Sequence, residues 1–111
     1  MTPELQEQAD HLAEHLLGWT RGSHNWLMQG TPVMQILREW HPHEKGSISQ
    51  CFAYIIPAML ERDFELLITM FDKFVEVTFN GLNKISGTGL DDTPEAAIVE
   101  AAYAAIKEKK E

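Results

Sequence analysis

The chain has 111 residues, 44% of them hydrophobic, and a formal net charge of −8. This length predicts one domain over residues 1–111, and no apolar run reaches the roughly 20 residues that cross a bilayer. Only nine Lys and Arg are spread along the chain, which disfavours contacts to nucleic-acid phosphates. The acidic N-terminal segment lacks signal-peptide features and Cys51 has no disulfide partner, so a cytoplasmic location is expected.

The N-terminal segment predicts an amphipathic helix. Thr2 suits the N-cap, Pro3 the first helical position and Gly18 the end. Apolar residues recur between them at three- and four-residue steps, namely Leu5, Ala9, Leu12, Ala13 and Leu16.

Residues 19–45 show little periodicity and predict mostly loop, with a short extended piece at Asn25–Met28. Val33–Trp40 fits either a strand or a helical turn. Trp19, Trp26 and Trp40 all lie in this segment. Exposed indoles would anchor a protein partner, whereas buried ones would fix the segment to the core, and both interpretations stay open.

A second helix is expected after the break at residues 41–46. Ser47 and Gln50 have the spacing of a capping box, and apolar residues follow at helical spacing. Pro57 lies inside this run and should kink the helix. The β-rich cluster Phe52–Ile56 leaves a strand as the alternative.

The clearest β signal is a hairpin over residues 64–79, with its turn at Asp72 and Lys73. One face of the hairpin is expected to lie buried against the first and last helices, and it comprises Leu66, Ile68, Val75 and Val77. Asn80-Gly81 predicts a turn, Leu82–Ile85 a short third strand and Ser86–Gly89 a flexible connection. Thr93 and Pro94 then predict the start of a last, alanine-rich helix.

Three segments, Ala13–Trp19, Met59–Ile68 and Asp91–Ile106, together resemble the small phage and prophage proteins of the phage ABA sandwich domain family. The shared features are a helix that ends in Gly-Trp, a helix that leads into a short sheet, and a terminal helix that starts with Thr-Pro. The resemblance implies a phage or prophage origin. The expected fold is α+β, a small sandwich in which a short antiparallel sheet, hairpin 64–79 with further strands, is covered by two or three helices.

Several groups of residues are of the types found in metal or catalytic sites, but none has the spacing or the partners that would predict such a site. His11, Glu14 and His15 match the H-x-x-E-H zinc motif, although a third protein ligand is missing and the motif is short. His41, His43, Glu44 and Cys51 match no common zinc spacing, and both His are expected at the surface. A helix start would lower the pKa of the Cys51 thiol, yet no base is placed beside it. Ser86–Gly89 lacks the Lys of a phosphate-binding loop.

The sequence therefore predicts a protein that is not an enzyme, binds no cofactor or metal and acts by binding a protein. Candidate partner-binding residues are two indoles and a cluster of acids, namely Trp26, Trp40, Asp91, Asp92 and Glu95. The expected partner is a host protein, and the sharpest form of the prediction is inhibition of a host defence system such as CRISPR. The alternatives are a small module with a double-stranded-RNA-binding-like fold and a metal hydrolase that uses His11, Glu14 and His15.

Overall fold

A computed structural model describes residues 3–21, 26–28, 35–37, 40–81 and 86–107. Helices and strands occur in the order α1 (Pro3–His15), β1 (Thr20–Arg21), β2 (Trp26–Met28), β3 (Gln35–Leu37), α2 (Ile48–Gln50), η1 (Cys51–Ile55), α3 (Ile56–Glu61), β4 (Phe64–Met70), β5 (Val75–Gly81), β6 (Gly87–Asp91) and α4 (Pro94–Lys107). The predicted α+β class is confirmed.

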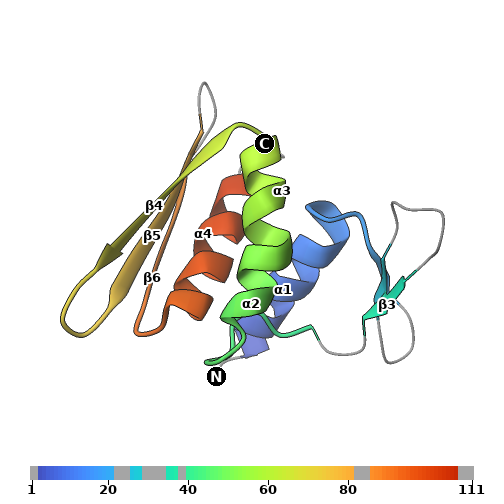
Figure 1. The fold of residues 1–111 in the computed structure, drawn as a ribbon, viewed down its shortest axis with the longest axis horizontal. Helices are drawn as coiled ribbons and strands as arrows, with labels where there is room; N and C mark the ends of the chain where they lie inside the picture. Colours follow the sequence, from blue (N-terminus) through green and yellow to red (C-terminus); the bar gives the residue numbers. More distant parts are fainter. Residues whose placement is uncertain (1–2, 22–25, 29–34, 38–39, 82–85, 108–111) are drawn as a thin grey trace.

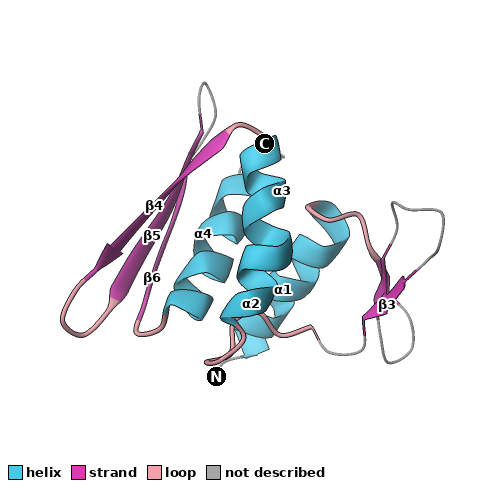
Figure 2. Cartoon of the chain, in the orientation of Figure 1, coloured by secondary structure: helices cyan, strands magenta, loops and turns pink. Residues whose placement is uncertain are grey.

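The helices form a layer between two antiparallel sheets (Figures 1 and 2). On one side lies the sheet β4-β5-β6, and α4 packs directly on β6 and β5. Helix α1 packs against the other side of α4, and the small sheet β1-β2-β3 lies beyond α1. The arrangement makes α4 the centre of the core, and eight of its apolar residues are buried, namely Ala96, Ala97, Ile98, Val99, Ala101, Ala102, Ala105 and Ile106.

Helix α1 forms where the apolar stripe predicted it, and Leu12, Ala13 and Leu16 are buried. Gly18 ends the helical turn with φ +74°, a conformation that strains any residue with a Cβ. This turn lets the N–H of Trp19 donate to the carbonyl of Ala13 at 2.9 Å. The chain is thereby redirected into β1.

The segment after α1 contains more strand than the sequence indicates. Thr20–Arg21 was predicted as loop but pairs with β2 as strand β1. The extended piece predicted at Asn25–Met28 is confirmed as β2 over its described residues, Trp26–Met28. Within Val33–Trp40, residues Gln35–Leu37 form strand β3 rather than a helical turn. These strands are too short for a period of two to be read from them.

The second helix runs without a break from Ile48 to Glu61, but its hydrogen-bonding pattern changes along its length. Between α2 and α3 the turn widens into the π-helix η1, and Pro57 lies in the first turn of α3. Pro57 has no N–H for the carbonyl four residues earlier, so the irregularity occurs where the sequence predicted a kink. The predicted capping box is wrong, because Ser47 makes no side-chain cap bond and Gln50 Oε1 accepts the N–H of His41 at 3.1 Å.

The predicted hairpin is confirmed, with β4 and β5 paired over seven residues and Phe71 N–H donating to Phe74 O across the Asp72-Lys73 turn. The prediction that one face of the hairpin is buried against the helices is partly wrong. Val75 and Val77 are buried, but Leu66 is only half-buried and Ile68 is 40% exposed. The reason is that α4 covers β5 and β6, the two strands farther from the β4 edge, while α1 packs on α4.

The third strand of this sheet is β6, which occupies the segment predicted as a flexible connection, while Leu82–Ile85 lies outside the described residues. Asn80-Gly81 ends β5 rather than forming a turn. A Cβ on Gly87 would meet backbone atoms of Ala101 and Ala105, and one on Gly89 would meet those of Ala97 and Ala101. Glycine in β6 and alanine in α4 thus let the two backbones touch. Among the described helices, none is both long and apolar enough to span a membrane.

Candidate functional site

The two indoles predicted to bind a partner lie in the core. Trp26 is 6% and Trp40 4% exposed. Trp40 Nε1 donates to the carbonyl of Ala9 at 2.6 Å, and its ring lies edge-on to Trp19 and Tyr54 at centroid distances of 4.9 and 6.1 Å. The rings therefore fix the β1–β3 region to the helices, as the second interpretation of the sequence proposed. In the single chain they offer little surface to a partner.

Arg21 covers the outer side of this indole cluster. Its guanidinium carbon lies 4.7 Å from the centre of the Trp26 ring, within cation–π range. The same guanidinium lies 3.4 Å from Asp10 and 3.5 Å from Glu14. Two acids of α1 are therefore paired within the chain. They contribute less negative surface than a count of acids suggests.

The predicted acidic residues Asp91, Asp92 and Glu95 gather where β6 leads into α4. Thr93 Oγ1 accepts the N–H of Ala96 at 3.3 Å, which confirms the predicted helix start. Glu95 is buried and its Oε2 accepts the N–H of Gly46 at 3.0 Å, so it joins two segments rather than facing solvent. Asp92 is exposed and Asp91 half-buried. Burial alone would raise the pKa of Asp91, but hydrogen bonds to Asp92 and Glu100 outweigh it, and the pKa is lowered.

A cavity of about 580 Å³ opens beside these acids. Its walls combine both charges with apolar surface, and are formed by Leu5, His43, Glu44, Lys45, Asp91, Asp92, Thr93 and Ala96. Carboxylates outnumber the one lysine, so the cavity suits the cationic side chain of a partner better than an anion. Two of the three acids nominated from sequence, Asp91 and Asp92, thus line a cavity.

His43 corrects the expectation that both His of the turn lie at the surface. It is only 3% exposed, whereas His41 is half-buried and its Nδ1 lies 3.5 Å from Glu44. Burial lowers the pKa of His43, an effect that Glu44 opposes and His41 reinforces. A neutral imidazole at physiological pH leaves the cavity with its negative balance.

The residues weighed for metal or nucleophilic chemistry are used in packing. The rings of His11 and His15 lie 4.3 Å apart, and His11 also contacts Tyr103 edge-on at 5.0 Å. In the part of the chain that the structure describes, no three His, Cys, Asp or Glu side chains are grouped to hold a metal ion. Cys51 is buried, and burial raises its pKa to about 12, opposite to the effect of a helix start.

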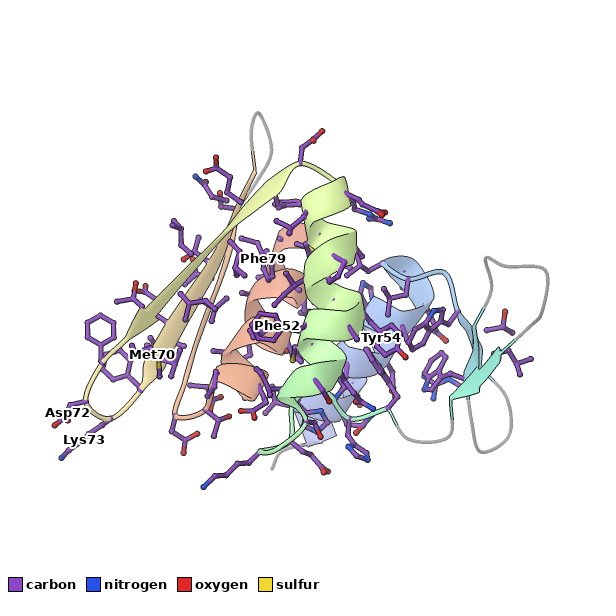
Figure 3. All side chains as sticks on the ribbon, viewed as in Figure 1. Phe52, Tyr54, Met70, Asp72, Lys73 and Phe79 are labelled. Carbon is purple, nitrogen blue, oxygen red and sulfur yellow. The ribbon has the colours of Figure 1, made fainter. Side chains whose placement is uncertain are left out.

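An apolar surface that sequence reasoning missed lies at the free end of the β4–β5 hairpin. Met70, Phe71 and Phe74, called the hairpin end here, are 71%, 47% and 38% exposed. Phe71 and Phe74 stack with centroids 4.5 Å apart, and Met70 lies on the opposite face of the strand. Figure 3 shows Met70 beside the turn of Asp72 and Lys73, which stands clear of the helices. The signal was present in the run Met70–Phe74, three apolar residues around a two-residue turn, where polar residues are usual.

The hairpin end adjoins the acidic cavity. Met70 pairs with Val75, and Val75 pairs with Asp91, so the three residues form one row across the sheet. With strands about 4.8 Å apart, the backbones of Met70 and Asp91 are separated by about 10 Å. Apolar side chains and carboxylates therefore share one end of the molecule, an arrangement typical of a protein-binding surface with an apolar centre and a polar rim.

Comparisons with protein-family models, with curated proteins and with solved structures find no significant match to this chain. The resemblance to the phage ABA sandwich family stays a prediction from motifs.

Proposed function

We propose that this protein acts by binding another protein, and that the hairpin end is the centre of the binding surface. The observation that carries the proposal is the exposure of Met70, Phe71 and Phe74 on both faces of a hairpin that projects from the helices. Large apolar side chains gathered at one site are unusual on the surface of a monomer and mark interaction sites. Aromatic anchors at such a site supply most of the binding free energy.

The charge distribution supports a partner with basic groups around an apolar groove. The hairpin end fills the groove in this arrangement, and the acids at the cavity, Asp91, Asp92 and Glu44, meet the basic groups. The net charge of −8 also favours a positively charged partner and opposes direct binding of nucleic acid. Binding to the basic face of a nucleic-acid-handling host defence protein, such as a CRISPR component, is the specific form of the proposal, and it rests on the motif resemblance to phage proteins.

A photo-crosslinking experiment tests the surface directly. A photoreactive phenylalanine replaces Phe74 in one variant and Leu60 in another, because Leu60 is also exposed (49%) but lies on α3, at the end of β4 that is away from the hairpin end. Irradiation in a lysate of the host should join a discrete protein to the position 74 variant and not to the position 60 variant. The captured protein is then purified and its affinity measured by calorimetry.

Phe74→Asp should weaken that affinity at least tenfold, as expected for loss of an aromatic anchor, while Leu60→Asp changes it less than twofold. Melting temperatures confirm that both variants fold. Equal losses in the two variants, or equal crosslinking at the two positions, would show that the hairpin end is not the binding surface.

A further inference from the structure

Strand β4 forms one edge of its sheet, and its backbone is directed so that another strand can pair with it. Phe71 N–H donates to Phe74 O across the turn, which makes Phe71 a hydrogen-bonded position. Because bonded and non-bonded positions alternate along an antiparallel pair, Leu67 and Thr69 direct their N–H and C=O groups toward β5. Leu66, Ile68 and Met70 therefore direct theirs toward the open side of the sheet.

This edge lacks the features that normally prevent pairing. Its sequence, FELLITM, contains one charged residue and no Lys, Pro or Gly, and β4 pairs with β5 over seven residues without a bulge. Leu67, Ile68 and Met70 are 55%, 40% and 71% exposed. The opposite edge is guarded, since Leu90 N–H on β6 donates to Glu100 Oε1 at 3.2 Å and α4 covers the strand.

We propose that two copies of this chain pair antiparallel through β4, with a two-fold axis at Leu67, and join their β4-β5-β6 sheets into one six-stranded sheet. In this register Leu66 pairs with the partner's Ile68, and Leu67 lies opposite the partner's Leu67. The axis passes at Leu67 because this residue is the middle of β4, where the overlap of the two strands is longest. The apolar row of each inner face then continues into that of the other copy.

The charges along the strand match a second copy of the same chain. Glu65, the one charge of β4, lies opposite the partner's Thr69, so no like charges meet within the pair. The turn of Asp72 and Lys73 comes alongside residues 61–63 of the other copy, a segment that also carries both signs. Phe71 and Phe74 lie beyond the paired strand and remain at the two ends of the joined sheet. This self-pairing does not depend on the function proposed above.

A disulfide crosslink tests both pairing and register. Leu67 faces the partner's Leu67 as a non-hydrogen-bonded pair, where Cα atoms lie about 4.5 Å apart, a separation that a disulfide can bridge. Leu67→Cys should therefore form a disulfide-linked dimer under mild oxidation at micromolar protein. Native Cys51 does not compete, because it is buried and its pKa is about 12. Leu90→Cys, equally exposed but on β6, is the matched control and should stay monomeric.

Sedimentation velocity and light scattering measure the mass of the unmodified protein, which should be twice the 12.6 kDa of one chain. Ile68→Pro removes an N–H that points to the open side, so it leaves the bonds to β5 intact and should give a monomer. Should that variant fold poorly, Thr69→Lys and Thr69→Glu provide a second test. Opposite the partner's Glu65, they should tighten and weaken the dimer respectively, each by about 3- to 10-fold over its two symmetric sites.

A monomer at all concentrations up to about 1 mM would overturn the proposal, as would a dimer that Ile68→Pro leaves unchanged, or equal crosslinking by the two cysteine variants. A chain that stays monomeric but binds a designed extended peptide along β4 would assign the edge to a foreign strand instead. Failure of the photo-crosslink at position 74 affects only the proposed function, and failure of the Leu67→Cys crosslink affects only the pairing.

Discussion

A single buried thiol shows how packing decides the chemistry of a residue in this protein. Cys51 lies at the start of η1 with its Sγ 3.3 Å from the carbonyl oxygen of Pro42 and 4.0 Å from that of Glu95. Burial is the main cause that raises its pKa from 9.0 to about 12, and the negative charge of Glu95 adds to it. A thiol that holds its proton this firmly is a poor nucleophile and a poor metal ligand. Cys51 therefore acts as a small packing residue.

The raised pKa of Cys51 predicts a loss of stability at high pH. Between about pH 9 and pH 12 the unfolded chain releases the Cys51 proton while the folded chain keeps it, so the free energy of unfolding falls as pH rises. Urea denaturation at several pH values in this window should give wild type a steeper fall than Cys51→Ala, by up to about 1.4 kcal/mol per pH unit. Lysine and tyrosine titrate in both proteins and cancel. Identical slopes would contradict the buried-thiol account.

At the scale of elements, the contact between α4 and β6 determines how the sheet joins the helices. Gly87 and Gly89 face α4, and the helix presents alanines to them. The exposed residue between them, Thr88, bonds across the outer face to Thr78 Oγ1 at 3.2 Å. Since the two backbones touch, a side chain on the inner face of β6 has no space, and rotation of a side chain cannot relieve the clash.

Gly89→Ala should therefore destabilise the protein by at least the upper part of the about 1–3 kcal/mol range seen for overpacked cores. The added Cβ would meet the backbone of Ala97 and Ala101, and it would also lie 2.9 Å from the Cβ of Glu100. Thr88→Ala changes the neighbouring residue on the exposed face and should cost less than about 1 kcal/mol. Chemical denaturation of both variants measures the difference, and equal losses would place α4 farther from β6 than described.

Elements with strong local signals were predictable, and elements that depend on distant contacts were not. The stripe of α1, the Asp72-Lys73 turn and the Thr93 cap specify their structures within a few residues, and all three are confirmed. The segment Gly87–Gly89 has the composition of a loop, and only its position between β5 and α4 makes it a strand. The hairpin end was missed because alternation predicts which residues share a face but not how far the covering helix extends.

At the scale of the whole molecule, the helices cover only part of the larger sheet. Helix α4 packs on β5 and β6, which leaves the part of β4 beyond Leu66 and the hairpin end largely uncovered at one side of the layer (Figure 1). The acids of the cavity lie at the same end, in the row that links Met70 to Asp91. The candidate acids could be named from sequence because they cluster around the start of a helix. The buried indoles could not be distinguished from exposed ones, because a tryptophan in an irregular segment has no period that indicates its face.

The net charge of −8 predicts opposite salt dependences for the two kinds of association. Two copies of the chain repel one another at long range, so added salt should leave the β4-paired dimer unchanged or strengthen it. A basic partner is attracted instead, so its on-rate at the hairpin end should fall as NaCl rises from about 50 to about 500 mM. The double substitution Asp91→Lys and Asp92→Lys replaces a negative with a positive charge at each position, which changes the net charge from −8 to −4. This variant should slow the basic partner several-fold without weakening the dimer. Stopped-flow fluorescence and sedimentation measure the two processes, and a melting curve checks that the fold is kept. If neither salt nor the charge reversal changes the on-rate, the acids are not part of the binding surface, which then consists of the apolar hairpin end.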